Sequence, residues 1–180
     1  MEQRQVNKMC PGRDVEKMAL SDVDNLLLSG LEKERKKLRE LLGLRGCIAI
    51  VGPEQSGKKV LLRSVCEVLN IQINVVPHKN HEPQDSYLVH HAFSQKSMNS
   101  LLFFDDETLC KWGAALVDFL SYPRSKKDIF VVLCLSRPYV LDKMVIRLFG
   151  QRLILVNPPA ALIRTLILKK ILQEKDIEVS

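Results

Sequence analysis

Short apolar runs alternate with longer segments of helical spacing over most of this chain. Apolar runs of this length are typical of strands buried on both faces of a parallel sheet, and they predict strands at residues 47–51, 71–76, 101–104, 129–135 and 153–156. The segments between them predict helices at residues 59–69, 87–97, 109–120, 141–148 and 160–172. This alternation indicates an α/β fold in which helices cover both faces of one sheet.

The first 43 residues have a different pattern. Residues 1–20 are polar and show no sustained period, so we expect a flexible N-terminal arm. Residues 21–43 predict a leading helix that begins at Ser21 and ends at Gly43, with Gly30 as an interruption. Its charged run, residues 32–40, is either a binding stripe for an acidic partner or a solvated helix face. Residues 44–180 then form the main domain.

Composition adds compartment and partner class to this picture. The 180 residues, of which 46% are hydrophobic, are enough for one domain with a core. The net charge of +6 favours acidic partners, or it serves solubility alone. The five cysteines include no CxxC pair, and three lie in apolar runs, which indicates a reducing compartment. We expect a cytoplasmic protein, nuclear or cytoskeletal locations included, with no membrane partner, because no stretch has the length of a span.

The clearest motif lies between the first predicted strand and the helix after it. A strand, a glycine-bounded turn and a helix N-terminus direct backbone N–H groups and a positive dipole end at one spot, which is a phosphate-binding loop. Lys58 adds a full charge there. The position after it, which in this motif is a Ser or Thr that holds Mg²⁺, is Lys59. The candidate nucleotide-binding residues are Gly52, Pro53, Glu54, Gln55, Ser56, Gly57, Lys58 and Lys59.

A second acidic site is predicted where the strand at residues 101–104 ends. Ligands of such folds bind at the carboxyl ends of the strands, where Asp105 and Asp106 follow directly. Asp105 would act on Mg²⁺ indirectly, and Asp106 or Glu107 would orient an attacking water. The alternative is a strand that reaches the surface and turns acidic there.

At this point the chain resembles the AAA ATPases. Residues 46–76 resemble their first strand, phosphate-binding loop, helix and second strand, and residues 101–107 resemble their Walker B strand. Residues 128–172 resemble the stretch from their fourth strand to the start of the lid, through the motifs Arg137-Pro138, Leu141-Asp142 and Arg147-Leu148-Phe149. Within that family the chain is most similar to the IQ-and-AAA-domain proteins of the ciliary nexin–dynein regulatory complex, which share Gly-Lys-Lys in this loop.

The resemblance implies a P-loop NTPase fold of the AAA type. This is a three-layer sandwich with a five-stranded, mainly parallel sheet, in which the Walker B strand is not beside the phosphate-loop strand. Arg147 matches the arginine finger, which acts only on a neighbouring subunit's nucleotide. The helical lid and its nucleotide-sensing arginine are expected to be absent. Ser136 stands where the family has a polar residue that positions the lytic water, and it is short for that role.

Lys59 decides between two functions. An ammonium cannot donate a lone pair and repels Mg²⁺, so the catalytic set of Asp105, Asp106 and Arg147 is expected to be vestigial. ATP or ADP could still be held by the loop. The sequence therefore predicts a degenerate AAA domain that acts as a structural or adaptor subunit of a larger assembly. The alternative is a slow, Mg-dependent ATPase in which Asp105 and Asp106 recruit Mg²⁺ through water and Lys59 points away.

The resemblance and the charge also suggest partners. Other protein subunits are expected, with tubulin or ciliary complex proteins as candidates, and a location in the cilium axoneme or cytoskeleton. Nucleic acid is not expected, because the aromatic residues lie in predicted core segments and offer no stacking platform. These are Phe103, Phe104, Phe130 and Trp112.

Overall fold

The computed structural model describes residues 21–44, 46–76, 99–121, 130–136, 149 and 152–174. Five parallel strands form one sheet in the order β2-β3-β4-β1-β5. The strands are β1 (Gly46–Val51), β2 (Gln72–Val75), β3 (Ser100–Asp105), β4 (Phe130–Leu135) and β5 (Leu153–Leu155). All five lie where the apolar runs predict them, to within one residue at either end.

The described helices are α1 (Asp22–Ser29), α2 (Glu32–Gly43), α3 (Lys58–Val68), α5 (Asp106–Ser121) and α8 (Ala161–Glu174). The last three correspond to predicted helices, and α5 begins three residues earlier than expected, directly after β3. The helices predicted at residues 87–97 and 141–148 lie outside the described residues.

The strand order separates the two motifs. β4 lies between β1, which leads into the phosphate-binding loop, and β3, which carries the acidic residues. Parallel register aligns the carboxyl ends of the three strands, since Val51 pairs with Leu135 and Asp105 with Cys134. The prediction that the acidic strand is not adjacent to the loop strand is confirmed, and so is the parallel sheet.

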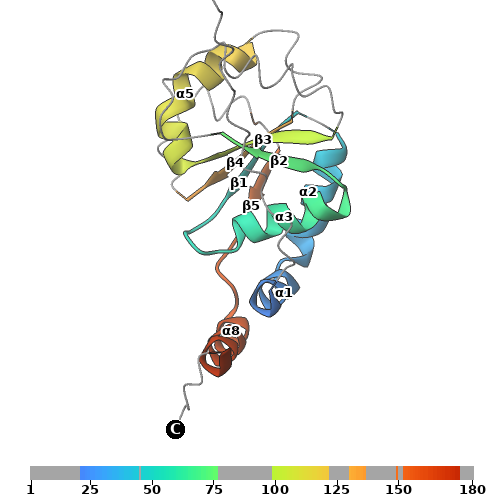
Figure 1. Cartoon of the computed structure of the whole chain (residues 1–180), viewed down its shortest axis with the longest axis vertical. Coiled ribbons are helices and arrows are strands. Elements are labelled where there is room, and N and C mark those ends of the chain that lie inside the picture. The colour runs from blue at the N-terminus through green and yellow to red at the C-terminus, as the bar shows by residue number, and fades with distance from the viewer. Residues whose placement is uncertain are drawn as a thin grey trace, which may run out of the picture.

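Helices cover both faces of the sheet, which makes three layers (Figure 1). Because side chains alternate along a strand, Ala49 and Val51 of β1 face the layer of α5, whereas Ile48 and Ile50 face the layer of α1, α2 and α3. Trp112 of α5 is fully buried on the first face. The structure thus confirms the α/β sandwich predicted from the sequence.

The leading segment differs from the prediction, because it forms two helices and not one. Ser21 caps α1 in a capping box with Asp24, and α1 ends at Ser29 because the chain turns at Gly30. α2 begins after Leu31, which is buried. The break lets leucines of both helices reach the same core cluster as the sheet; they are Leu28, Leu31, Leu38 and Leu42.

α8 follows β5 and lies apart from the sandwich, beside α1 (Figure 1). An ion pair of 2.8 Å joins Lys170 of α8 to Asp22 of α1. Several large apolar side chains of α8 are exposed, Leu162 most of all. No described helix combines the length and the apolar composition that crossing a bilayer requires.

Two of the described cysteines and the four aromatic residues named above lie in the core. Cys66 and Cys134 are buried, and burial raises the pKa of each thiol to about 12, so both stay protonated. Cys47 is half-buried and Cys110 is exposed, and none of these four cysteines forms a disulfide among the described residues. The four aromatic residues predicted to be in core segments, Phe103, Phe104, Phe130 and Trp112, are all buried.

Candidate phosphate-binding site

The loop between β1 and α3 is fixed to the sheet at its first residue. The amide of Gly52 donates to the carbonyl of Leu135 on β4 at 3.0 Å. A side chain on Gly52 would collide with the carbonyl of Val156, so only glycine fits this close approach. At the other end, Gly57 has φ +91°, a left-handed conformation that starts α3 directly. The two glycines thus set where the loop begins and where the helix N-terminus points.

Between these glycines the loop has an exposed crest and a buried side. Pro53, Glu54 and Gln55 are exposed, and Gln55 has φ +60°. Ser56 is buried, at 2% exposure, and its hydroxyl has no hydrogen-bond partner among the described residues. Buried hydroxyls are normally hydrogen-bonded. The unpaired Oγ of Ser56 therefore marks the inside of the loop as a place where a polar ligand atom would be stabilised.

Lys58 is buried and folds back onto the loop. Its ammonium donates to the carbonyls of Gly52 (2.7 Å) and Pro53 (2.5 Å) and to Oγ of Ser136 (3.1 Å). Burial lowers the pKa of Lys58, and the nearby carboxylates of Asp106 and Glu54 oppose the shift. A lysine in this position brings one positive charge to the helix N-terminus, and a bound phosphate would compete with the loop carbonyls for it.

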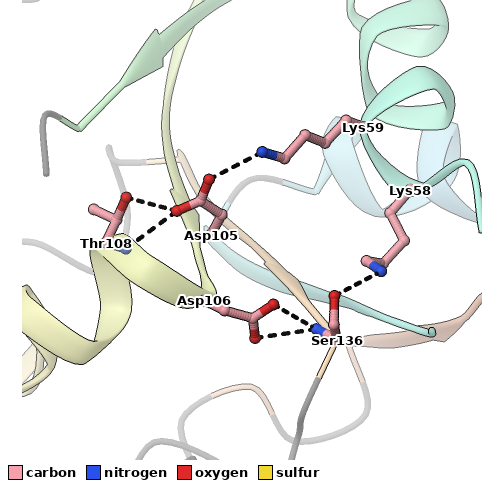
Figure 2. Close-up of polar contacts among 6 residues, drawn as sticks. All are labelled: Lys58, Lys59, Asp105, Asp106, Thr108 and Ser136. Atoms are coloured by element: carbon pink, nitrogen blue, oxygen red, sulfur yellow. Dashed lines mark hydrogen bonds and ion pairs between the residues drawn. The ribbon is translucent and has the colours of Figure 1, made fainter. Parts of the chain in front are cut away.

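Lys59, the residue that departs from the motif, bonds directly to the acidic strand. Its ammonium lies 2.9 Å from Oδ2 of Asp105, as Figure 2 shows. The same nitrogen lies 5.6 Å from the centre of the Phe103 ring, within the range of a cation–π contact. The alternative in which Lys59 points away from Asp105 is therefore not the arrangement observed. The pair links α3 to the end of β3 across the site.

Asp105 also caps the helix that follows it. Its Oδ1 accepts hydrogen bonds from the amide (3.1 Å) and the hydroxyl (2.8 Å) of Thr108. Burial alone would raise the pKa of Asp105, but the bonds from Lys59 and Thr108 outweigh it and hold that pKa below its ordinary value. The sequence analysis missed Thr108. The available signal was an aspartate three residues before a threonine at the start of an apolar run, which is the spacing of an N-cap.

Asp106 is held by the next strand. Both of its carboxylate oxygens accept the amide of Ser136, at 3.1 and 2.9 Å. The hydroxyl of Ser136 accepts from Lys58, so one serine connects Lys58 with Asp106 (Figure 2). Ser136 was predicted to be too short to position water, and in the structure it holds two charged groups in place. The carboxylates of Asp105 and Asp106 and the ammonium groups of Lys58 and Lys59 thus form one polar cluster at the carboxyl end of the sheet.

This cluster does not fit Mg²⁺. The ion needs oxygen ligands in near-octahedral arrangement, whereas Asp105 presents one oxygen to an ammonium and the other to Thr108. The position that would supply a hydroxyl ligand carries the ammonium itself. Among the described residues, no group of three or more His, Cys, Asp or Glu could hold a metal ion. Arg147, the predicted arginine finger, lies outside the described residues.

The fold, though not the site, can be compared with solved structures. The Holliday junction branch migration motor RuvB of Thermotoga maritima superimposes with a TM-score of 0.57, over 91% of this chain and 53% of that one, at 16% identity. The chain therefore has a P-loop NTPase-like α/β fold. It spans about half the length of RuvB, and an identity this low shows a likeness of fold alone. No model of a known protein family and no curated protein matches the chain.

Proposed function

We propose that this AAA-type domain is a catalytically impaired subunit that holds a nucleotide without hydrolysing it and acts as a structural or adaptor part of a larger assembly. The observation that carries the proposal is the ion pair between Lys59 and Asp105. In P-loop enzymes the residue at the position of Lys59 supplies a hydroxyl, and the residue at the position of Asp105 a carboxylate, that serve a magnesium ion. Here the ammonium of Lys59 and the carboxylate of Asp105 neutralise each other's charge.

Loss of hydrolysis follows from what the remaining groups can do. Phosphoryl transfer depends on positioning and on neutralising charge that develops on the phosphate oxygens, and a metal supplies several kcal/mol of that stabilisation. Asp106, one of the two candidates that would orient water beside Glu107, is held by the Ser136 amide, whose N–H both of its oxygens share. A carboxylate fixed in this way has less freedom to activate a water molecule.

Binding does not need these steps. The first amides of α3 have no acceptor within the helix, and with Lys58 they favour an anion at the loop. The buried, unpaired hydroxyl of Ser56 adds a donor on the same loop. Retention of an ATP or ADP molecule as a fixed part of the fold is therefore compatible with loss of turnover.

The adaptor role is suggested by surface charge and by the resemblance to ciliary proteins. α2 exposes five basic residues, which would suit an acidic surface such as that of tubulin. They are Lys33, Arg35, Lys36, Lys37 and Arg39. On this proposal the domain works in the cytoskeleton, with the axoneme as the candidate location. Its partners are other protein subunits.

Steady-state phosphate release from ATP with Mg²⁺ tests the enzymatic part. We expect the purified chain to release phosphate no faster than Lys58→Ala, because neither can form the metal-assisted transition state. Lys36→Ala, which changes an exposed lysine of α2, is the matched control. Steady release that disappears in Lys58→Ala but persists in Lys36→Ala would contradict the proposal and establish the ATPase alternative.

A further inference from the structure

We infer that the ligand of this loop is a nucleoside diphosphate free of magnesium, and that the ammonium of Lys59 serves as the built-in cation beside its phosphates. The inference rests on the proposed function, since it specifies the nucleotide that the domain holds. It starts from the disagreement between the site and Mg²⁺, which is a property of this chain's own residues.

The position of Lys59 gives it two possible partners at once. Its side chain is 63% exposed, and one of its three N–H donors reaches Asp105. Lys59 is the second residue of α3, so its other two N–H donors are available to an anion bound at the start of that helix. A bridge from Asp105 through the ammonium to a phosphate oxygen makes the connection that a metal makes in P-loop enzymes. The bridge needs no metal because the cation is covalently attached.

The number of charges favours two phosphates over three. Lys59 carries a single positive charge where Mg²⁺ carries two, and part of that charge is already spent on Asp105. A third phosphate would extend the anion toward the strand ends, where Asp105 and Asp106 lie. Asp106 is close enough to raise the pKa of Lys58 against the effect of burial. Without a divalent ion, the terminal phosphate of a triphosphate would meet this negative charge unscreened.

The loop itself points independently to a ligand. Only 2% of the surface of Ser56 is exposed, and its Oγ has no hydrogen-bond partner in the part of the chain that the structure describes. That hydroxyl lies beside Gly52, since a side chain there would approach it to 3.0 Å. A phosphate oxygen held by the loop would satisfy it. The unpaired hydroxyl of Ser56, the ammonium of Lys58, which folds back onto the loop carbonyls, and the ammonium of Lys59 thus belong to the loop and the first turn of α3.

Calorimetric titration of the full chain with ADP and with ATP, each in EDTA and in excess Mg²⁺, tests the inference. We expect ADP to bind in EDTA, more tightly than ATP, and Mg²⁺ not to strengthen that binding. Lys59→Met should weaken ADP binding in EDTA by about tenfold, the effect of one charge-assisted hydrogen bond. Lys59→Thr, which restores the usual hydroxyl, should bind ADP more tightly with Mg²⁺ than with EDTA. Lys169→Met, which changes an exposed lysine of α8, is the control and should match the unaltered chain.

The outcomes separate this inference from the proposed function. Binding by the unaltered chain only in Mg²⁺, or equal affinity in Lys59→Met, would overturn the role of Lys59 and leave nucleotide retention intact. Tighter binding of ATP than of ADP in EDTA would overturn the diphosphate preference. Absence of binding to both nucleotides in all conditions would refute nucleotide retention itself, and with it this inference.

Discussion

Asp105, the last residue of β3, has two roles in one side chain. It caps α5 through Thr108, and it forms an ion pair with Lys59. Burial raises the pKa of Asp105, but the hydrogen bonds from Lys59 and Thr108 lower it by a larger amount. The folded-state pKa therefore lies below the ordinary value of 3.8. The stabilisation from the carboxylate is therefore complete above the pKa of the unfolded chain and is lost as the pH falls through the folded-state pKa.

This sign predicts how Asp105→Asn behaves with pH. At about pH 7 the variant should melt at a lower temperature than the unaltered chain, because the charged hydrogen bonds to Lys59 and Thr108 are weakened. Below about pH 4 the unfolded chain binds a proton at Asp105 before the folded chain does, so the difference in Tm should shrink as the pH falls toward the lower folded-state pKa. Thermal unfolding followed by circular dichroism measures both values. Glu40→Gln, on an exposed side chain of α2, is the control. A difference that stays constant into acid would show that the charge of Asp105 contributes nothing.

The same residues show what sequence reasoning could reach at this scale. The loop from Gly52 to Lys59 and the acidic pair were predicted because each is a local pattern after an apolar strand. The bond between Lys59 and Asp105 was not predicted, since the two lie 46 residues apart and β4 separates β3 from β1, the strand that leads to Lys59. Repulsion of a metal by Lys59 could be argued from its charge alone. Its partner depends on strand order and on side-chain direction.

At the scale of elements, the parallel strands were the most predictable part. Each is a continuous apolar run, because both faces are covered, and such runs end sharply. The leading segment was harder, because Gly30 is compatible with either a weak point in one helix or a break between two. The break is decided by tertiary packing, since it allows Leu28 of α1 and Leu38 of α2 to join the same cluster.

This packing predicts that α2 is required for the stability of the sheet. Leu38 is fully buried against the core, whereas Leu44, just beyond the helix, is 67% exposed. Leu38→Ala should lower the free energy of unfolding by about 2–5 kcal/mol, through lost burial and a residual cavity. Leu44→Ala, the control, should change it by less than about 0.5 kcal/mol. Urea unfolding followed by the fluorescence of Trp112 gives both values. Equal, small effects would mean that α2 is not part of the core.

At the scale of the whole molecule, the sequence pattern predicts the fold, whereas the net charge predicts only the class of partner. The three-layer α/β sandwich was predictable, because strand and helix patterns and the loop motif agree with one another. Net charge limits the class of partner but does not locate a surface. In the structure the basic residues of α2 are exposed, whereas Leu38 and Leu42 of the same helix are buried. Lys37 is partly committed there, since its ammonium donates to the carbonyl of Leu153 at 2.8 Å.

If α2 is the side that meets an acidic filament, the position of a charge should matter more than the total charge. Lys36→Glu, on α2, should weaken co-sedimentation with microtubules by about two- to tenfold at low salt, and the difference should shrink as salt is raised. Arg164→Glu changes the net charge equally on α8, where the side chain is also exposed, and it should bind like the unaltered chain. Equal losses in the two variants would reduce the interaction to general attraction between a basic protein and an acidic polymer. A loss confined to Lys36→Glu would require contact through α2, since the two variants have the same net charge.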